Sequence, residues 1–256
     1  LEFRRVLFRS AITVDSWQVP EVGEAAARTW RYGRLTERAR ELGAVRVVSG
    51  HTGSDRAETL LLQLARGSHR RGLAGPQALR PLTHGIQLAR PLLAFSRGDT
   101  ARLCRELRLP IWPDPSNQDP AFARNRIRGE VLPVLEALHP GSAQRLCALS
   151  ERLHEEEQAL AELAERALPS LLLPQATGAD SLDRRSLMAL KPANQRRLLQ
   201  GWLSREGASP LPSRQLEDLL TRLRPGRAAG MRALAAGRTL HWDRQRLWLA
   251  EAGHLP

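Results

Sequence analysis

One feature of the sequence restricts the possible fold more than any other. It is a short β-branched run that is followed, after one turn, by an amphipathic helix. Residues 44–48 read AVRVV, which is typical of a buried parallel strand, and the run ends at Ser49-Gly50-His51. Residues 55–67 then space apolar side chains three and four apart, as on one helix face. These side chains are Ala57, Leu60, Leu61 and Leu64. Residues 21–42 predict a preceding helix with Gly43 as its stop. Helix, strand, turn and helix in this order indicate an α/β layer fold.

The alternation continues through the first half of the chain. Residues 86–93 predict another strand, and Ser96 begins a helix that should end at Pro110. We expect this helix to turn its apolar residues inward, with a buried thiol among them; they are Leu103, Cys104 and Leu107. Residues 113–120 are too rich in proline, aspartate and asparagine for a helix or strand interior. Residues 123–141 again predict a helix, kinked near Pro133.

The second half is mostly helical in pattern. Residues 142–168 predict a long amphipathic helix, and the proline- and glycine-containing stretch 169–180 predicts a linker. Three helices follow, around 181–190, 193–205 and 213–223. Leu240 and Trp242, then Leu247 and Leu249, alternate around residues 243–245, which indicates a closing hairpin. The predicted fold class is α/β with a Rossmann-like parallel sheet, followed by a smaller, mostly helical domain with a C-terminal hairpin.

The charge of the chain favours a polyanionic partner. The 256 residues hold 39 basic and 27 acidic side chains, for a net charge of +12, and Lys191 is the single lysine. Nucleic acid and an anionic membrane surface both fit this balance, while the arginine excess also reflects the base composition of the source genome. No apolar run approaches the roughly 18–20 residues that span a bilayer. Two separated cysteines, Cys104 and Cys147, make no zinc or iron–sulfur ligand set and suit a reducing cytoplasm.

Polar side chains follow the predicted strand at residues 44–48. His51 comes just after it, and Asp55 and Glu58 begin the next helix. Ligands of open α/β sheets bind beyond the carboxyl ends of the strands, so these three side chains are candidates for substrate orientation, ammonium recognition or proton transfer. A structural interpretation stays open, since Asp55 and Glu58 alone make a capping box and His51 suits an ordinary loop.

Arginines recur in two further segments, residues 69–72 (HRRG) and 124–128 (RNRIR). On a helix, Arg124 and Arg128 would lie one turn apart, a spacing suited to phosphate contacts on RNA or a nucleotide. A solvated helix face paired with acidic neighbours explains them equally well. The tryptophans Trp112, Trp202 and Trp242 offer stacking surfaces, although core positions are commoner for such residues. The sequence has no GxGxxG, GxxxxGK[ST], zinc-protease or GxSxG motif.

Three ordered blocks resemble the tRNA(Ile)-lysidine synthase family, a branch of the PP-loop ATP pyrophosphatases. Residues 50–75 are similar to its HxxxDxxET…RGxxxxGLAG block, residues 90–97 to its RPLL block, and residues 109–133 to its DxSNxDxxxxRNRIRxxxLP block. The helix with Arg28, Arg31 and Tyr32 and the segment 187–249 also resemble the family, so the likeness covers about residues 19–249.

The resemblance implies an enzyme, a ligase that joins lysine to C2 of the wobble cytidine in the CAU anticodon of tRNA(Ile). ATP adenylates the cytidine, and the lysine amine then displaces AMP to give lysidine, with diphosphate as the other product. ATP as co-substrate, Mg²⁺, L-lysine and tRNA(Ile) are the implied cofactors and partners. No membrane is involved, the reaction is cytoplasmic, and a homodimer is left open.

Site residues follow from the same resemblance, position by position. The matched catalytic set is His51, Asp55 and Glu58. The matched tRNA- and substrate-binding set is Arg28, Arg31, Arg70, Arg71, Asp114, Ser116, Asn117, Arg124, Asn125, Arg126 and Arg128. No metal ligand is implied among them. Carboxylates suit a lysine ammonium, and an amine nucleophile must lose protons during its attack.

The sequence departs from the family pattern in two ways. Thr52 and Arg56 stand where family members often have histidine and glutamine, and the SGGxDS phosphate loop is absent. We expect a truncated reading frame that is inactive alone, with residues 1–10 as linker or adapter sequence. The expected domains are a partial PP-loop domain over 11–140, a connecting helix and linker over 141–180, and a substrate-binding domain over 181–256. The alternatives are a PP-loop tRNA thiolase and a non-catalytic RNA-binding fragment.

Overall fold

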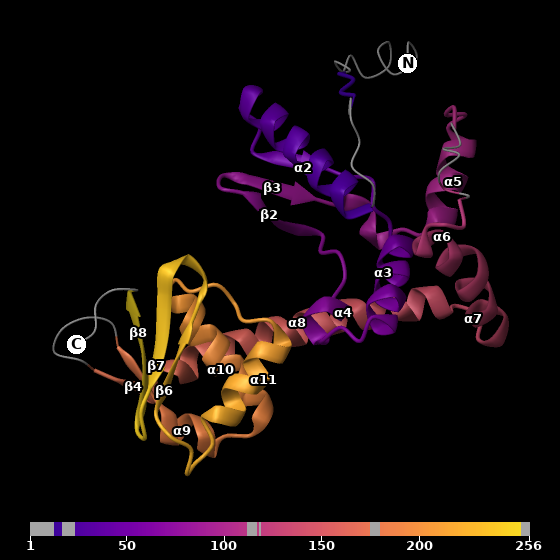
Figure 1. Cartoon of the computed structure of the whole chain (residues 1–256). Helices are drawn as coiled ribbons and strands as arrows, with labels where there is room; N and C mark the ends of the chain where they lie inside the picture. The colour runs from indigo at the N-terminus through magenta and orange to yellow at the C-terminus, as the bar shows by residue number, and fades with distance from the viewer. Residues whose placement is uncertain (1–12, 17–23, 112–116, 118, 175–179, 252–256) are drawn as a thin grey trace. The chain divides into compact units, whose positions relative to one another are not determined.

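The structure is a computed structural model that describes residues 13–16, 24–111, 117, 119–174 and 180–251. The chain divides into two compact units, residues 1–154 and 155–256. Each unit is described by itself below, with its elements labelled in Figure 1. No helix in these described ranges is long and apolar enough to cross a membrane.

A three-stranded sheet and one helix form the small core of the first unit. Helix α2 (Glu24–Glu41) precedes β1 (Arg46–Val48), and the strand order is β1-β3-β2. Strand β1 runs parallel to β3 (Ile86–Ala89), while β2 (Leu79–Thr83) pairs antiparallel with β3. In Figure 1, α2 lies along this sheet. The buried contacts between them come from Ala39, Val47, Ile86 and Leu88, with Tyr32, Leu35, Ala44 and Leu82 packed around them.

The predicted helix–strand order is confirmed, with differences in burial and in strand number. Gly43 ends α2 at φ +61°, a conformation that glycine adopts without strain. Only the middle residue of β1 is buried, and Val48 is 65% exposed, because β1 lies at the edge of the described sheet. Strand β2 was not predicted, although Gly85 at φ +76° marks the hairpin turn that joins it to β3.

The first turn of α3 (Gly53–Ala65) differs from the predicted capping box. Thr52 is the N-cap, so Asp55 occupies the third helical position and its carboxylate accepts hydrogen bonds from Thr52. The prediction that Asp55 caps the helix with Glu58 is therefore wrong, because the N-cap is Thr52 and the helix begins three residues earlier. Ala57 and Leu60 are buried as expected, while Leu64 is exposed.

The prediction that helix α5 (Arg97–Glu106) buries its apolar face is wrong. Ser96 caps it and Asp99 completes a capping box, as its start predicted, but none of its residues is buried. Leu103 is 52% and Leu107 59% exposed, and Cys104 is half-buried rather than a core thiol. The apolar spacing is that of an amphipathic helix, but the described residues bring no element over that stripe. Arg108, at φ +50°, turns the chain before Pro110 is reached.

The segment with the RNRIR motif is helical but irregular. Helix α6 (Ala123–Arg126) passes into a π-turn, η3 (Ile127–Val131), and then into α7 (Leu132–Leu138). Pro133 has no N–H to donate to the carbonyl four residues earlier, so the widened turn falls where the kink was predicted. Two short elements complete this unit, α4 (Arg70–Leu73) and the 3₁₀ turn η1 (Pro91–Ala94).

The boundary between the two units falls inside a helix. Helix α8 (Ser142–Ala167) matches the predicted long helix, and the units divide between His154 and Glu155. The expected linker over 169–180 differs from the structure in its described part. Leu168 and Leu171 of η4 (Leu168–Leu171) are buried in the second core, and β4 (Leu172–Leu173) joins its sheet. Their leucines supply apolar area that a solvated linker lacks.

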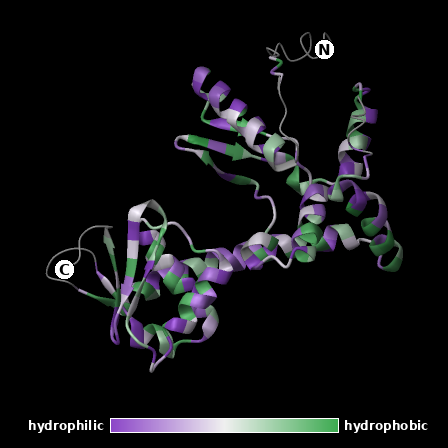
Figure 2. Ribbon diagram, viewed as in Figure 1, coloured by the Kyte–Doolittle hydropathy of each residue, from purple (hydrophilic) through white to green (hydrophobic). Residues whose placement is uncertain are grey.

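The second unit packs helices against an antiparallel sheet of order β4-β5-β8-β7-β6. The strands are β5 (Ser181–Asp183), β6 (Gly230–Ala233), β7 (Arg238–Trp242) and β8 (Arg246–Glu251). The helices are α9 (Arg184–Ala189), α10 (Pro192–Arg205) and α11 (Ser213–Arg222), and a 3₁₀ turn η5 (Ala235–Gly237) precedes β7. Figure 2 shows hydrophilic and hydrophobic residues mixed along α10 and α11, as amphipathic helices require.

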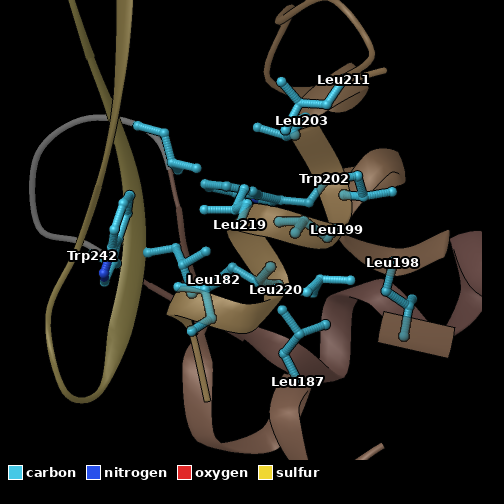
Figure 3. Packing of buried hydrophobic residues seen from close by; sticks show 14 of the residues in the cluster. Leu182, Leu187, Leu198, Leu199, Trp202, Leu203, Leu211, Leu219, Leu220 and Trp242 are labelled. Atoms are coloured by element: carbon cyan, nitrogen blue, oxygen red, sulfur yellow. The ribbon is translucent and has the colours of Figure 1, made fainter. Parts of the chain in front are cut away.

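Two of the three predicted core tryptophans are confirmed here. Trp202 of α10 and Trp242 of β7 are buried, with leucines from both helices and strands between them (Figure 3). The predicted hairpin is also confirmed, since Trp242 pairs with Leu247 and Leu240 with Leu249. Trp112 lies outside the described residues. Residues 181–183 form β5 rather than a helix, and β6 was not predicted.

Candidate active site

The candidate site lies where the parallel strands β1 and β3 end. The backbone N–H of Ser49 donates to Ala89 O at 2.9 Å, so the chain leaves both strands at the same edge. His51 follows β1 and Arg90 follows β3. The N-terminus of α3 is fixed there too, because Gly53 N–H donates to Phe95 O at 2.8 Å. This is the crevice position that the sequence predicted.

His51 is held as a partly buried imidazole in a basic surrounding. Its Nδ1 lies 2.8 Å from Ser49 Oγ. Burial lowers the pKa of His51, the charge of Asp55 opposes this, and three arginines lower the pKa further; these are Arg90, Arg124 and Arg28. The ring is therefore neutral at pH 7 and can accept a proton.

Asp55 is an ionised carboxylate at the start of α3. Its Oδ2 accepts from the backbone N–H of Thr52 at 2.8 Å and from its hydroxyl at 2.9 Å, and Arg97 lies 3.8 Å from Oδ1. Burial alone would raise the pKa of Asp55, but the Thr52 hydrogen bonds, with the charges of His51 and Arg97, hold it below its ordinary value. The carboxylate is available to a cationic group.

Glu58 is buried in an ion pair with the RNRIR segment. Its side chain is 1% exposed, and Arg128 donates to both carboxylate oxygens, at 2.7 and 2.9 Å. Arg124 Nε lies 3.5 Å from Glu58 Oε2, and its Nη2 donates to Thr59 Oγ1 at 3.0 Å. The hydrogen bond with Glu58 raises the pKa of Arg128. The geometry thus makes Glu58 the residue that fixes two arginines, one of which acts electrostatically on His51.

A second cluster surrounds Tyr32 of α2. The guanidinium carbons of Arg28 and Arg80 lie 5.6 and 5.4 Å from its ring centroid. Burial would raise the pKa of Tyr32, but a hydrogen bond from Arg90 and the charges of Arg90, Arg28 and Arg80 hold it lower. Arg90 itself is buried and donates from Nη1 to Gln77 O at 2.8 Å. Arg80 and Arg90 were not predicted site residues, although Arg90 opens the RPLL block directly after a strand.

The remaining predicted residues that the structure describes are exposed or have contacts outside the cluster around His51. Asn125 donates from Nδ2 to Asp119 O at 2.9 Å and so shapes the turn before α6. Arg126 is exposed and pairs with Glu130 at 3.0 Å, as the solvated-face interpretation expected. Arg31, Arg70 and Asn117 are exposed. Asp114, Ser116 and the side chain of Arg71 lie outside what the structure describes.

The described side chains around His51 carry more positive than negative charge. No group of three or more His, Cys, Asp or Glu side chains in the described part of the chain is arranged to hold a metal ion. Of the two carboxylates of the site, that of Glu58 is bound by Arg128, while that of Asp55 accepts hydrogen bonds from Thr52 at Oδ2 only. A Mg²⁺ ion that arrives with ATP needs only one or two carboxylates beside the substrate phosphates, and no chemical step below uses such an ion.

Family models and relatives match both units of the chain. The model of the PP-loop domain matches residues 7–135, and the TilS substrate binding domain matches residues 182–248. A tRNA(Ile)-lysidine synthase of Parasynechococcus marenigrum is 53% identical over 252 residues, covering 95% of this chain and 72% of that protein. The chain belongs to the tRNA(Ile)-lysidine synthase family. A synthase of Prochlorococcus marinus is 39% identical, covering 88% of this chain and 68% of that protein.

Membership of this family confirms the predicted fold class, an α/β PP-loop domain followed by a second domain. Among solved structures, the U34-tRNA thiolase NcsA from Methanococcus maripaludis matches with a TM-score of 0.43 and 18% identity. That match covers 60% of this chain and 49% of the thiolase. At this level the likeness supports no statement about function.

Proposed function

We propose that this protein ligates lysine to C2 of the wobble cytidine in a tRNA(Ile) with a CAU anticodon, by way of an adenylated cytidine. The reaction type rests on the family to which the chain belongs. One structural observation carries the assignment to this site: the Glu58 ion pairs join the RNRIR segment to the helix that bears Asp55, directly beside His51. Two blocks far apart in sequence thereby form one site.

The proposed first step creates a leaving group on the base. Oxygen O2 of the cytidine attacks the α-phosphorus of ATP, the bond to diphosphate breaks, and O2 becomes linked to AMP. Arg28, Arg90 and Arg124 place positive charge around His51, where phosphate oxygens would be stabilised. Guanidinium groups remain charged at any working pH, so this role does not depend on protonation.

The proposed second step uses His51 and Asp55. Asp55 attracts the ammonium group of lysine, and neutral His51 takes the proton that the amine must lose. The Nε atom of lysine then bonds to C2, the C2–O2 bond breaks, and AMP leaves. In the tautomer whose Nδ1–H donates to Ser49 Oγ, Nε2 is the nitrogen that accepts this proton. We place tRNA, ATP and L-lysine as partners of this site, in the cytoplasm.

The test is incorporation of labelled lysine into a tRNA(Ile) transcript with ATP present. Two proteins are assayed, the 256-residue chain and a version preceded by the SGGxDS segment of the family. Asp55→Asn and His51→Gln should each lower incorporation. For His51→Gln, which removes the proton acceptor, we expect a loss of about 100-fold. Asp99→Asn is the matched control, because Asp99 makes the same capping contacts at the start of α5.

The outcomes separate the alternatives. Lysine incorporation by the extended protein, lost in Asp55→Asn and kept in Asp99→Asn, supports the proposal. Unchanged incorporation in Asp55→Asn would contradict the site assignment. Transfer of sulfur instead of lysine would show a thiolase, and tRNA binding with neither reaction would show an RNA-binding protein.

A further inference from the structure

The second unit contains a pocket of about 500 Å³ at the end of its sheet. Pockets for small ligands and single chemical groups run from about 300 to 1,000 Å³. Its floor is formed by buried Leu223 and by the half-buried side chain of Met188. Its rim comes from three places in the chain: the start of α9, the turn after α11 at residues 225–228, and the hairpin turn between β7 and β8.

Arginines line this pocket on every one of those segments. Arg185, Arg227 and Arg244 are exposed around the opening. Within the described residues, the ion pairs of this unit within 4.0 Å involve other arginines, while the charge of Arg185 acts at longer range and lowers the pKa of Asp183. Asp183 and Asp243 are the neighbouring carboxylates. Asp183 accepts from the start of α9, and Asp243 accepts from Gln245 N–H and pairs with Arg246 at 3.6 Å.

A fourth arginine, Arg184, fixes the backbone of the turns that surround the pocket. Arg184 is 3% exposed and donates to backbone carbonyls only, those of Arg222, Leu223, Arg224, Arg227 and Asp243. It therefore ties the turn after α11 and the hairpin turn to the start of α9. Because Arg184 binds main-chain atoms, it fixes the backbone of these turns and leaves the exposed side chains of Arg185, Arg227 and Arg244 at the opening of the pocket.

We infer that this pocket binds one nucleotide of the RNA substrate, with Arg185, Arg227 and Arg244 on its phosphates. A guanidinium group can donate two parallel hydrogen bonds to two oxygens of one phosphate. An apolar floor suits the face of a base or a ribose. This inference rests on the proposed function, since it takes tRNA as the substrate. It adds a contact point on the second unit that is separate from the residues around His51.

The experiment measures binding of a fluorescently labelled tRNA(Ile) transcript to the full chain by anisotropy, at several salt concentrations. Each of Arg185→Ala, Arg227→Ala and Arg244→Ala should weaken binding by about 5–10-fold and lower the salt slope by about 1. The triple variant should lose affinity further. The control removes three exposed basic side chains outside the pocket lining, Lys191→Ala, Arg205→Ala and Arg214→Ala, and so changes net charge equally. Thermal unfolding confirms that both triple variants fold.

Each result decides the matter. A loss of affinity larger in the pocket triple variant than in the control supports the inference. Equal losses, or unchanged binding in the pocket variant, overturn it and leave the proposed function standing. If the unsubstituted chain does not bind tRNA, both fail. AMP and inorganic diphosphate are titrated in parallel; if the pocket variants lose these anions while tRNA binding is unchanged, the pocket takes a free anion and the RNA assignment is wrong.

Discussion

Arg128 donates two hydrogen bonds to the carboxylate of Glu58, at 2.7 and 2.9 Å, across 70 residues of sequence. The pair is bidentate, with the carboxylate buried and the guanidinium partly exposed. This geometry stabilises the ion pair and also fixes the orientation of the guanidinium, because its planar donors match the two carboxylate oxygens. It also means that Glu58 positions two arginines, Arg124 and Arg128.

Replacing Glu58 should therefore destabilise the first unit. Glu58→Gln leaves Arg128 and Arg124 without their carboxylate, which we expect to cost about 2–3 kcal/mol, reduced from a fully buried case because both arginines reach solvent. Glu130→Gln is the control, since Glu130 forms an exposed pair with Arg126 and should change nothing measurable. Urea unfolding measures both; equal midpoints would show that the Glu58 pair does not hold the unit together.

The pKa of His51 should depend on two named neighbours. It should lie below the ordinary value of about 6.5, because burial and three arginines disfavour the charged ring. Asp55→Asn should lower it further, since the Asp55 charge raises it, and Arg124→Ala should raise it. Imidazole NMR titration measures the three values, with His51→Gln to assign the signal. A shift in the opposite direction in either variant would show that the neighbouring charge is not the cause.

Stability of the first unit should fall in acid through Asp55. The folded pKa of Asp55 lies below its ordinary value of about 3.9, so the ionised carboxylate stabilises the fold fully above that pH. This stabilisation is lost as the pH falls through the lower folded value. At pH 6 we expect Asp55→Asn to cost about 1 kcal/mol, as for a lost helix cap, and the difference from the parent should vanish in strong acid. Unfolding midpoints across pH measure this, and a difference that stays constant with pH would contradict it.

Arg184 should be the most sensitive arginine of the second unit. Arg184→Ala removes donors from five backbone carbonyls, which we expect to cost about 2–4 kcal/mol and to increase hydrogen exchange in residues 222–228 and 243–246. Arg185→Ala, one residue along, should leave exchange unchanged because its side chain is exposed. Equal protection in the two variants would mean that the carbonyl contacts do not hold these turns.

Periodicity in the sequence predicted most helices and the closing hairpin. The alternation of Leu240, Trp242, Leu247 and Leu249 set both the strands and their register, because a one-residue slip would expose all four. Strand β2 escaped prediction since Arg80, Pro81 and Thr83 do not alternate with apolar residues. The strand forms because it pairs with β3, and a pattern local to residues 79–83 holds no information about that partner.

Local patterns also suggested candidate site residues, but they did not predict the contacts between them. His51, Asp55 and the arginines were found from spacing and from resemblance. The ion pair of Glu58 was not, because its partners come from a segment about 70 residues later. The sequence pattern also does not distinguish Arg184, which is buried, from its neighbour Arg185, which is exposed. Burial of a charge depends on which carbonyls the fold brings to it.

The contacts of Arg184 bear on how freely the surrounding sequence can vary. Its guanidinium recognises the path of the main chain, which every amino acid shares, and ignores the side chains at Arg222, Arg224 and Arg227. These positions can therefore exchange residues without loosening the turn. The rim of the pocket is thus free to be retuned toward a different RNA while the scaffold beneath it stays the same.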